Sequence, residues 1–234
     1  MTNLKTLKNI GISDTRMAKA AKALKYRSGD AISRKFSHLK DRFGDYTNVM
    51  INKDPDVLAM SEQKVDKIID FFTNYGFNKN VFLGRLSKCP RILKRSTSSI
   101  KSILGFFESK NFAKEEIIKL ISKDPGLLLR KKDTVATRYK ALESRMEDET
   151  KRVVLAFPAI VRCYGVEAIN KRLDVFEQIS GEVGMKELFS NPIRLSYNPD
   201  TVMKRFNFFK SRGLSYKELF ISKDKFKRRF GIEL

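Results

Sequence analysis

The chain has 234 residues, of which 41% are hydrophobic and 18 are phenylalanine, so it can bury a sizeable core and is too apolar to be disordered. Its 48 lysines and arginines exceed its 27 aspartates and glutamates by 21, which favours a polyanionic partner, nucleic acid first and an anionic membrane surface second. No apolar run approaches the ~20 residues of a bilayer span, and Cys89, Cys163 and the single His38 form no cluster, so we expect no integral membrane segment, metal site or cofactor.

Residues 1–40 are predicted to form a separate basic segment. Within it, residues 15–26 place Met17, Ala20 and Leu24 on one face of an amphipathic helix that is rich in lysine and poor in acidic residues, as is typical of a mitochondrial presequence. The turn-like Gly11-Ile12-Ser13 instead favours a cap on the repeat array that follows. The segment is therefore either a cap or a cleaved presequence, and residues 41–234 are predicted to be the array.

Proline marks an internal repeat. Prolines stand at positions 55, 90, 125, 158 and 192, with spacings of 35, 35, 33 and 34 residues. An aliphatic residue follows each of them by three positions: Leu58, Leu93, Leu128, Val161 and Leu195. A period of this length is typical of helical repeat proteins, so we expect about five copies of one supersecondary unit. A degenerate sixth copy, from Ile221 to Asp224, has Lys225 where the proline would stand.

Each unit is predicted to hold two helices. Apolar residues recur at helical spacing after the proline and end in an aromatic pair, such as Phe71-Phe72 or Phe106-Phe107, which we assign to the core. Gly76, Asn111 or Gly213 then fits a left-handed helix end, and a second helix, such as 80–87, 114–121 or 216–220, runs to the next proline.

Proline ends that helix and begins a short 3₁₀ turn. The predicted fold is therefore an all-α solenoid, with two helices plus a short 3₁₀ turn in each stacked repeat and a long concave surface.

The order Lys-Asp/Cys-Pro-x-hydrophobic-Leu, amphipathic helix, Phe-Phe and Gly-Phe/Leu resembles the repeat of the mitochondrial transcription termination factor (mTERF) family over residues 41–234. The resemblance implies a left-handed, half-ring superhelix that is monomeric and grips nucleic acid in a basic concave groove, with double-stranded DNA favoured over RNA. It also implies a role in organellar transcription termination, transcription regulation or ribosome assembly. The implied compartment is the mitochondrial or plastid matrix, with the bacterial cytoplasm as the alternative.

Basic residues recur in phase with the repeat in three series, which we interpret as a stripe that follows a phosphate backbone. The first series follows the proline anchors: Arg91, Lys94, Arg95, Arg130, Lys131, Lys132, Arg162, Arg194, Arg228 and Arg229. The second lies in the middle of the first helices: Arg138, Arg172 and Arg205. The third lies twenty residues after the proline: Lys110, Arg145 and Arg212. The alternatives are a solvated outer face and the lysine-rich composition of AT-rich genomes.

Two tyrosines, Tyr164 and Tyr197, are candidates for base stacking, although packing is the favoured role for both. No phosphate-binding loop, HExxH motif or paired carboxylates occur, and one histidine excludes most general-base schemes, so we predict that the chain is not an enzyme. Three other functions stay open: an RNA or ribosome-assembly factor, a protein-interaction scaffold that uses the same groove for an acidic partner, and a binder of anionic lipid.

Overall fold

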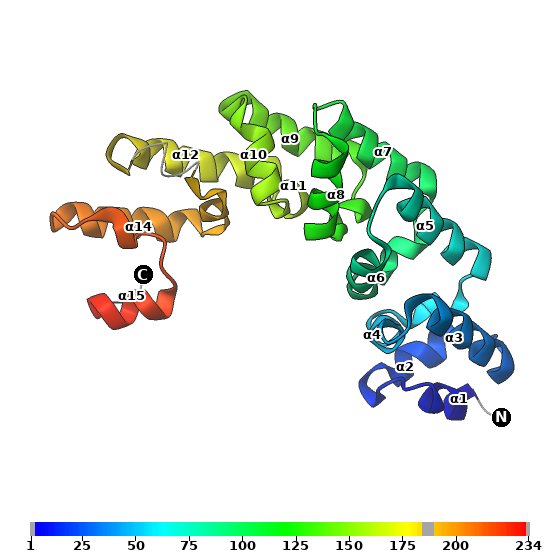
Figure 1. Ribbon diagram of the computed structural model, residues 1–234. Helices are drawn as coiled ribbons and strands as arrows, with labels where there is room; N and C mark the ends of the chain where they lie inside the picture. Colours follow the sequence, from blue (N-terminus) through cyan, green and yellow to red (C-terminus); the bar gives the residue numbers. More distant parts are fainter. Residues whose placement is uncertain (1–2, 184–189, 233–234) are drawn as a thin grey trace. The chain divides into compact units, whose positions relative to one another are not determined.

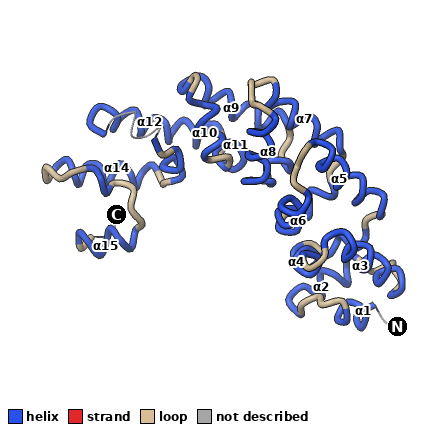
Figure 2. The backbone as a smooth tube through the Cα atoms, viewed as in Figure 1, coloured by secondary structure: helices blue, strands red, loops and turns tan. Residues whose placement is uncertain are grey.

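The computed structural model describes residues 3–183 and 190–232, except for the side chains of residues 180, 182 and 183. Every regular element in these residues is a helix (Figure 2). The chain divides into two compact units, Met1–Lys132 and Asp133–Leu234. The predicted all-α class and the repetition of helices with 3₁₀ turns are confirmed.

The first unit begins with two helical hairpins. Helices α1 (Asn3–Asn9) and α2 (Asp14–Ala23) form one, and α3 (Gly29–Phe43) and α4 (Tyr46–Lys53) form the other. The two hairpins are in contact, and the Asn52 side chain on α4 accepts a hydrogen bond from the Ser13 N–H at 2.8 Å and donates to the Gly11 carbonyl at 2.9 Å. Residues 3–40 thus pack onto the first proline-bearing repeat. Helix α3 continues across the predicted boundary between the basic segment, residues 1–40, and the repeat array, residues 41–234.

The predicted unit follows twice in this part of the chain, and η3 begins a third copy. Its elements are η1 (Pro55–Ala59), α5 (Glu62–Tyr75), α6 (Lys79–Lys88), η2 (Pro90–Lys94), α7 (Thr97–Glu108), α8 (Lys114–Lys123) and η3 (Pro125–Leu129). Helices α3, α5 and α7 follow one another in one row, and α4, α6 and α8 follow in a second row (Figure 1). The 3₁₀ turns form a third row, in which η1 contacts η2 and η2 contacts η3.

Local chemistry explains where these helices begin and end. Ser61 and Ser96 accept hydrogen bonds from the backbone N–H groups of Lys64 and Ser99, which caps the first helix of each unit. Gly76 and Asn111 have positive φ values of 103° and 59°, as predicted for the helix ends. The anchors Leu58, Leu93 and Leu128 are buried, and so are Phe72 and Phe107, the second members of the aromatic pairs.

The second unit holds α9 (Lys132–Met146), α10 (Glu149–Ala156), α11 (Ala159–Cys163), α12 (Val166–Val183), η4 (Pro192–Ser196), α14 (Pro199–Ser211), η5 (Tyr216–Glu218) and α15 (Lys223–Phe230). Two details differ from prediction. Pro158 begins the short α-helix α11 instead of a 3₁₀ turn, and its carbonyl accepts from both Val161 and Arg162. The predicted second helix at 216–220 is only the 3₁₀ turn η5. Helix α15 runs straight through Lys225, because without proline nothing excludes residue 224 from a helix.

Candidate nucleic-acid interface

The post-proline cations of the first unit come together on neighbouring turns. Arg91 lies exposed on η2, and Arg130, Lys131 and Lys132 lie exposed where η3 ends and α9 begins. The guanidinium of Arg95 reaches from the end of η2 to the carbonyl of Arg130, with an Nη2–O distance of 3.4 Å. Since η2 packs against η3, these five residues form one cationic surface, which we call the turn-row surface.

Lys94 belongs to the same series but is already neutralised. Its ammonium lies 2.7 Å from Asp54 and 2.6 Å from Asp56 at the start of η1. Burial works against the charged ammonium, but the hydrogen bonds to Asp54 and Asp56 hold the pKa of Lys94 above its usual value. The turn-row surface therefore begins at η2, because the first copy offers Ala59 and Met60 with two carboxylates instead of cations.

The three mid-helix arginines bind the backbone of the next repeat. Arg138 donates to the carbonyls of Val161 at 3.2 Å and Arg162 at 2.6 Å. Arg172 donates to Leu195 at 2.9 Å, and Arg205 donates to Leu219 at 3.2 Å. Each guanidinium therefore satisfies carbonyls at the end of a short helix or turn, where intrahelical donors are lacking.

Burial and stacking support this structural role. Arg205 is only 1% exposed, and its guanidinium lies 4.4 Å from the centre of the Phe226 ring. Arg172 lies 4.0 Å from the ring centre of Tyr164. We call Arg138, Arg172 and Arg205 the arginine staples, and their sequence period reflects repeat-to-repeat packing.

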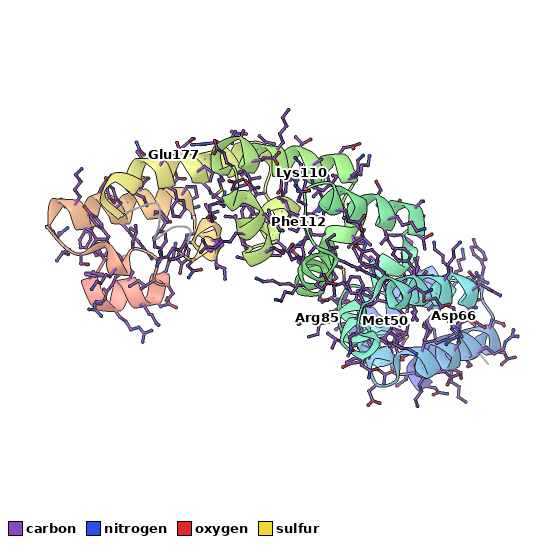
Figure 3. The ribbon with its side chains drawn as sticks, turned by 45° about the horizontal axis from the view of Figure 1, so that its top comes forward. Met50, Asp66, Arg85, Lys110, Phe112 and Glu177 are labelled. Carbon is purple, nitrogen blue, oxygen red and sulfur yellow. The ribbon has the colours of Figure 1, made fainter. Side chains whose placement is uncertain are left out.

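The third series is also engaged in contacts. The Arg145 guanidinium lies 2.7 Å from Asp174 and 2.6 Å from Glu177, both on α12, and the hydrogen bond to Glu177 is the main cause of its raised pKa. Arg212 is exposed and covers the Phe208 ring at 4.0 Å. Lys110 lies half-buried just after α7, which is the last helix in the row of α3, α5 and α7 (Figure 3).

The remaining predicted cations lie in the second unit. Arg162 is half-buried, and Arg194 lies 5.0 Å from the Phe220 ring centre. Arg229 pairs with Glu218 at 2.7 Å, and the Arg228 side chain donates to the Asp224 carbonyl at 3.3 Å. These last two residues border an open hollow of about 540 Å³ beside α15. This unit therefore holds its predicted cations mostly in contacts of its own.

The decisive comparison is between the chain and the sequence models of known protein families. The sequence model of the family named mTERF matches residues 48–227, from α4 to α15, which is more than three quarters of the chain. The chain belongs to the mTERF family. Members of this family are non-enzymatic nucleic-acid binders. A search of curated proteins finds no match to the chain.

The mTERF fold also presents cations that the sequence prediction missed. Lys53, Lys88 and Lys123 stand two residues before successive prolines and are exposed at the ends of α4, α6 and α8. Arg85 and Lys119 lie one turn earlier on α6 and α8 (Figure 3 labels Arg85). The lysine that recurs two residues before proline was the sequence signal for Lys53, Lys88 and Lys123. Cations are common at helix C-termini because they interact favourably with the helix dipole, so this recurrence did not by itself indicate a binding surface.

The remaining expectations concern the two tyrosines, metal ligands and membrane-spanning helices. Tyr164 lies 6.0 Å from Phe157 between ring centres, and the Tyr197 hydroxyl donates to the Phe220 carbonyl, so both tyrosines make packing contacts. Within residues 3–183 and 190–232, no three His, Cys, Asp or Glu side chains gather as metal ligands. In the same residues, no helix combines the length and the apolar composition needed to cross a membrane.

Proposed function

We propose that this mTERF protein binds nucleic acid through the turn-row surface, with duplex DNA preferred over RNA, and acts in the regulation or termination of transcription in an organellar matrix. One observation carries the proposal. Arg91, Arg95, Arg130, Lys131 and Lys132 lie on adjacent turns, and no described carboxylate forms an ion pair with any of them.

Unpaired cations on a rigid surface suit a phosphate backbone. Each phosphate that a lysine or arginine neutralises releases counterions, which supplies affinity without reading the base sequence. Successive turns in contact hold such cations at a fixed spacing, whereas cations on loops would first have to be ordered. The preference for DNA, the role in transcription and the compartment come from the family alone.

The test compares two triple variants that remove the same charge. The first variant removes three charges from the turn-row surface by Arg130→Ala, Lys131→Ala and Lys132→Ala. The control variant removes three exposed lysines from α3, α5 and α7 by Lys40→Ala, Lys67→Ala and Lys101→Ala. Fluorescence anisotropy with labelled duplex DNA and duplex RNA, from 50 to 300 mM NaCl, measures affinity and its salt dependence.

For the wild type we expect log affinity to fall with log salt by about 0.9 per phosphate contacted, and the turn-row variant to lose up to about 2.7 from that slope. The control variant should keep most of the slope. An affinity that does not change with salt, or an equal loss of slope in the two variants, would refute the turn-row surface as the binding site. Tighter binding to RNA would refute the preference for DNA.

A further inference from the structure

A groove separates the second helices of two consecutive repeats. It lies between α6 and α8, has a volume of about 390 Å³, and is lined on each side by residues three or four positions apart. Val81 and Ile118 supply its apolar lining, with Val81 55% exposed. Arg85, Lys119 and Lys123 supply its cations, against the single carboxylate of Glu115.

Two differences between repeats account for the groove. Helices α4 and α6 pack closely, and the Tyr46 ring of α4 lies directly over Gly84 of α6. One repeat later, at a spacing of 35 residues, Lys119 stands at the position of Gly84 and Val81 at the position of Tyr46. A long charged side chain replaces the bare backbone and a small one replaces the covering ring. Helix α8 accordingly contacts α6 less extensively than α6 contacts α4.

The lining indicates what would fill the groove. A phosphate backbone would pair with Arg85, Lys119 and Lys123 but would leave the exposed Val81 covered by polar groups. An amphipathic helix with acidic flanks satisfies both features, since its apolar residues at helical spacing cover Val81 and Ile118 while its carboxylates meet the cations. The stretch from residue 78 to residue 85 spans about 10 Å, or two turns of such a helix.

We propose that the α6–α8 groove docks an acidic amphipathic helix of a partner protein. This site goes beyond the proposed nucleic-acid binding, because it lies on helices α6 and α8 instead of the η2 and η3 turns. The protein would then hold a nucleic acid and a protein at separate sets of cations.

The probe is a fluorescein-labelled synthetic helical peptide of about 15 residues, with leucine at helical spacing on one face and glutamate elsewhere. A second peptide has the same composition with its leucines dispersed around the helix. Anisotropy titrations use the full chain as wild type, as Val81→Asp, as Arg85→Glu with Lys119→Glu, and as a control with Lys40→Glu and Lys67→Glu. Val81 lies in the first turn of α6, where a carboxylate favours the helix, so Val81→Asp is expected to fold, and circular dichroism verifies this.

We expect the amphipathic peptide to bind the wild type and the control alike, and each groove variant to weaken binding by at least about tenfold. The Arg130, Lys131 and Lys132 alanine variant should bind the peptide normally, so that failure of the nucleic-acid proposal and failure of this one are distinguishable. Three results would overturn the groove proposal: no binding by the wild type, equal binding of the dispersed peptide, or a loss of duplex DNA binding in Val81→Asp as large as its loss of peptide binding.

Discussion

At the scale of single residues, the position thirteen or fourteen after the proline shows why charge alone does not identify a binding site. It holds Ile68 and Ile103 in the first unit, both buried, and Arg138, Arg172 and Arg205 in the second. The position in the repeat is thus shared, but burial and chemistry differ, since Arg205 is buried like the isoleucines whereas Arg138 and Arg172 are half-buried. Where arginine stands, its guanidinium completes the hydrogen bonds of the next repeat, which an isoleucine cannot do.

Replacement of Arg205 by leucine tests the staples. Leucine restores an apolar side chain but leaves the Leu219 and Ile221 carbonyls without their donor, so we expect the free energy of unfolding to fall by about 1–3 kcal/mol. Urea denaturation followed by circular dichroism measures it. Lys204→Leu, an exposed neighbour on α14, is the matched control and should change stability little. Equal midpoints for Arg205→Leu and the wild type would mean that the staple contributes nothing.

Asp54 gives a prediction for pH. Its side chain is 6% exposed, and although burial opposes its charge, hydrogen bonds and ion pairs with Lys94 and Lys19 hold its pKa below the usual value. A carboxyl with a lowered folded-state pKa stabilises the fold above the unfolded pKa of about 3.9 and loses that contribution as the pH falls through the folded value.

Asp54→Asn should therefore cost about 1–3 kcal/mol at pH 7, and the difference from the wild type should shrink as the pH falls below about 4. Urea midpoints between pH 7 and pH 3 measure the trend. Asp70→Asn, an exposed carboxylate on α5, provides the comparison at pH 7 and should leave the midpoint unchanged. A difference that stays constant with pH would show that the charge of Asp54 is not what stabilises the fold.

At the scale of elements, the sequence predicted what repeats and missed what varies between repeats. Proline fixes φ and removes a donor, so the turns η1, η2, η3 and η4 followed directly from four of the five proline positions. The α-helical α11 and the shortened η5 depend on the local competition between i+3 and i+4 hydrogen bonds, which no single residue decides. The groove between α6 and α8 arises where the equivalent of the Gly84–Tyr46 contact is missing, and that contact joins residues 38 positions apart.

Substitutions at Gly84 test how closely α4 and α6 approach. A Cβ there would lie 3.0 Å from Cζ of Tyr46, which is the outer end of a ring that is 45% exposed and free to turn away. Gly84→Ala should therefore be close to neutral, because the gain in helix propensity of about 1 kcal/mol offsets the displaced contact. Gly84→Leu cannot be accommodated by the ring alone and should destabilise by about 1–3 kcal/mol. Thermal unfolding of both variants measures the contrast, and equal stabilities would exclude close packing at this position.

At the scale of the whole molecule, net charge predicted the class of partner but not the residues that meet it. The +21 surplus and its phase with the repeat pointed to nucleic acid, and the family supports that class. The individual cations then divided among three roles. Some form the turn-row surface, some act as staples, and some, such as Lys94 and Arg145, pair with carboxylates of a neighbouring repeat. Sequence spacing cannot separate these roles, because partners between 14 and 40 residues away decide them.

The same surplus charge predicts opposite effects of salt on folding and on binding. A net charge of +21 repels itself in the compact state, and salt with a Debye length of about 10 Å at 0.1 M screens that repulsion. Raising NaCl from 50 to 300 mM should therefore raise the urea midpoint, although screening also weakens exposed pairs such as Lys171–Asp200, which are worth little. Duplex affinity should fall over the same range, because salt competes with counterion release. Urea midpoints and anisotropy on one preparation measure both trends. A midpoint that falls with salt would mean that ion pairs between repeats outweigh the repulsion among excess cations.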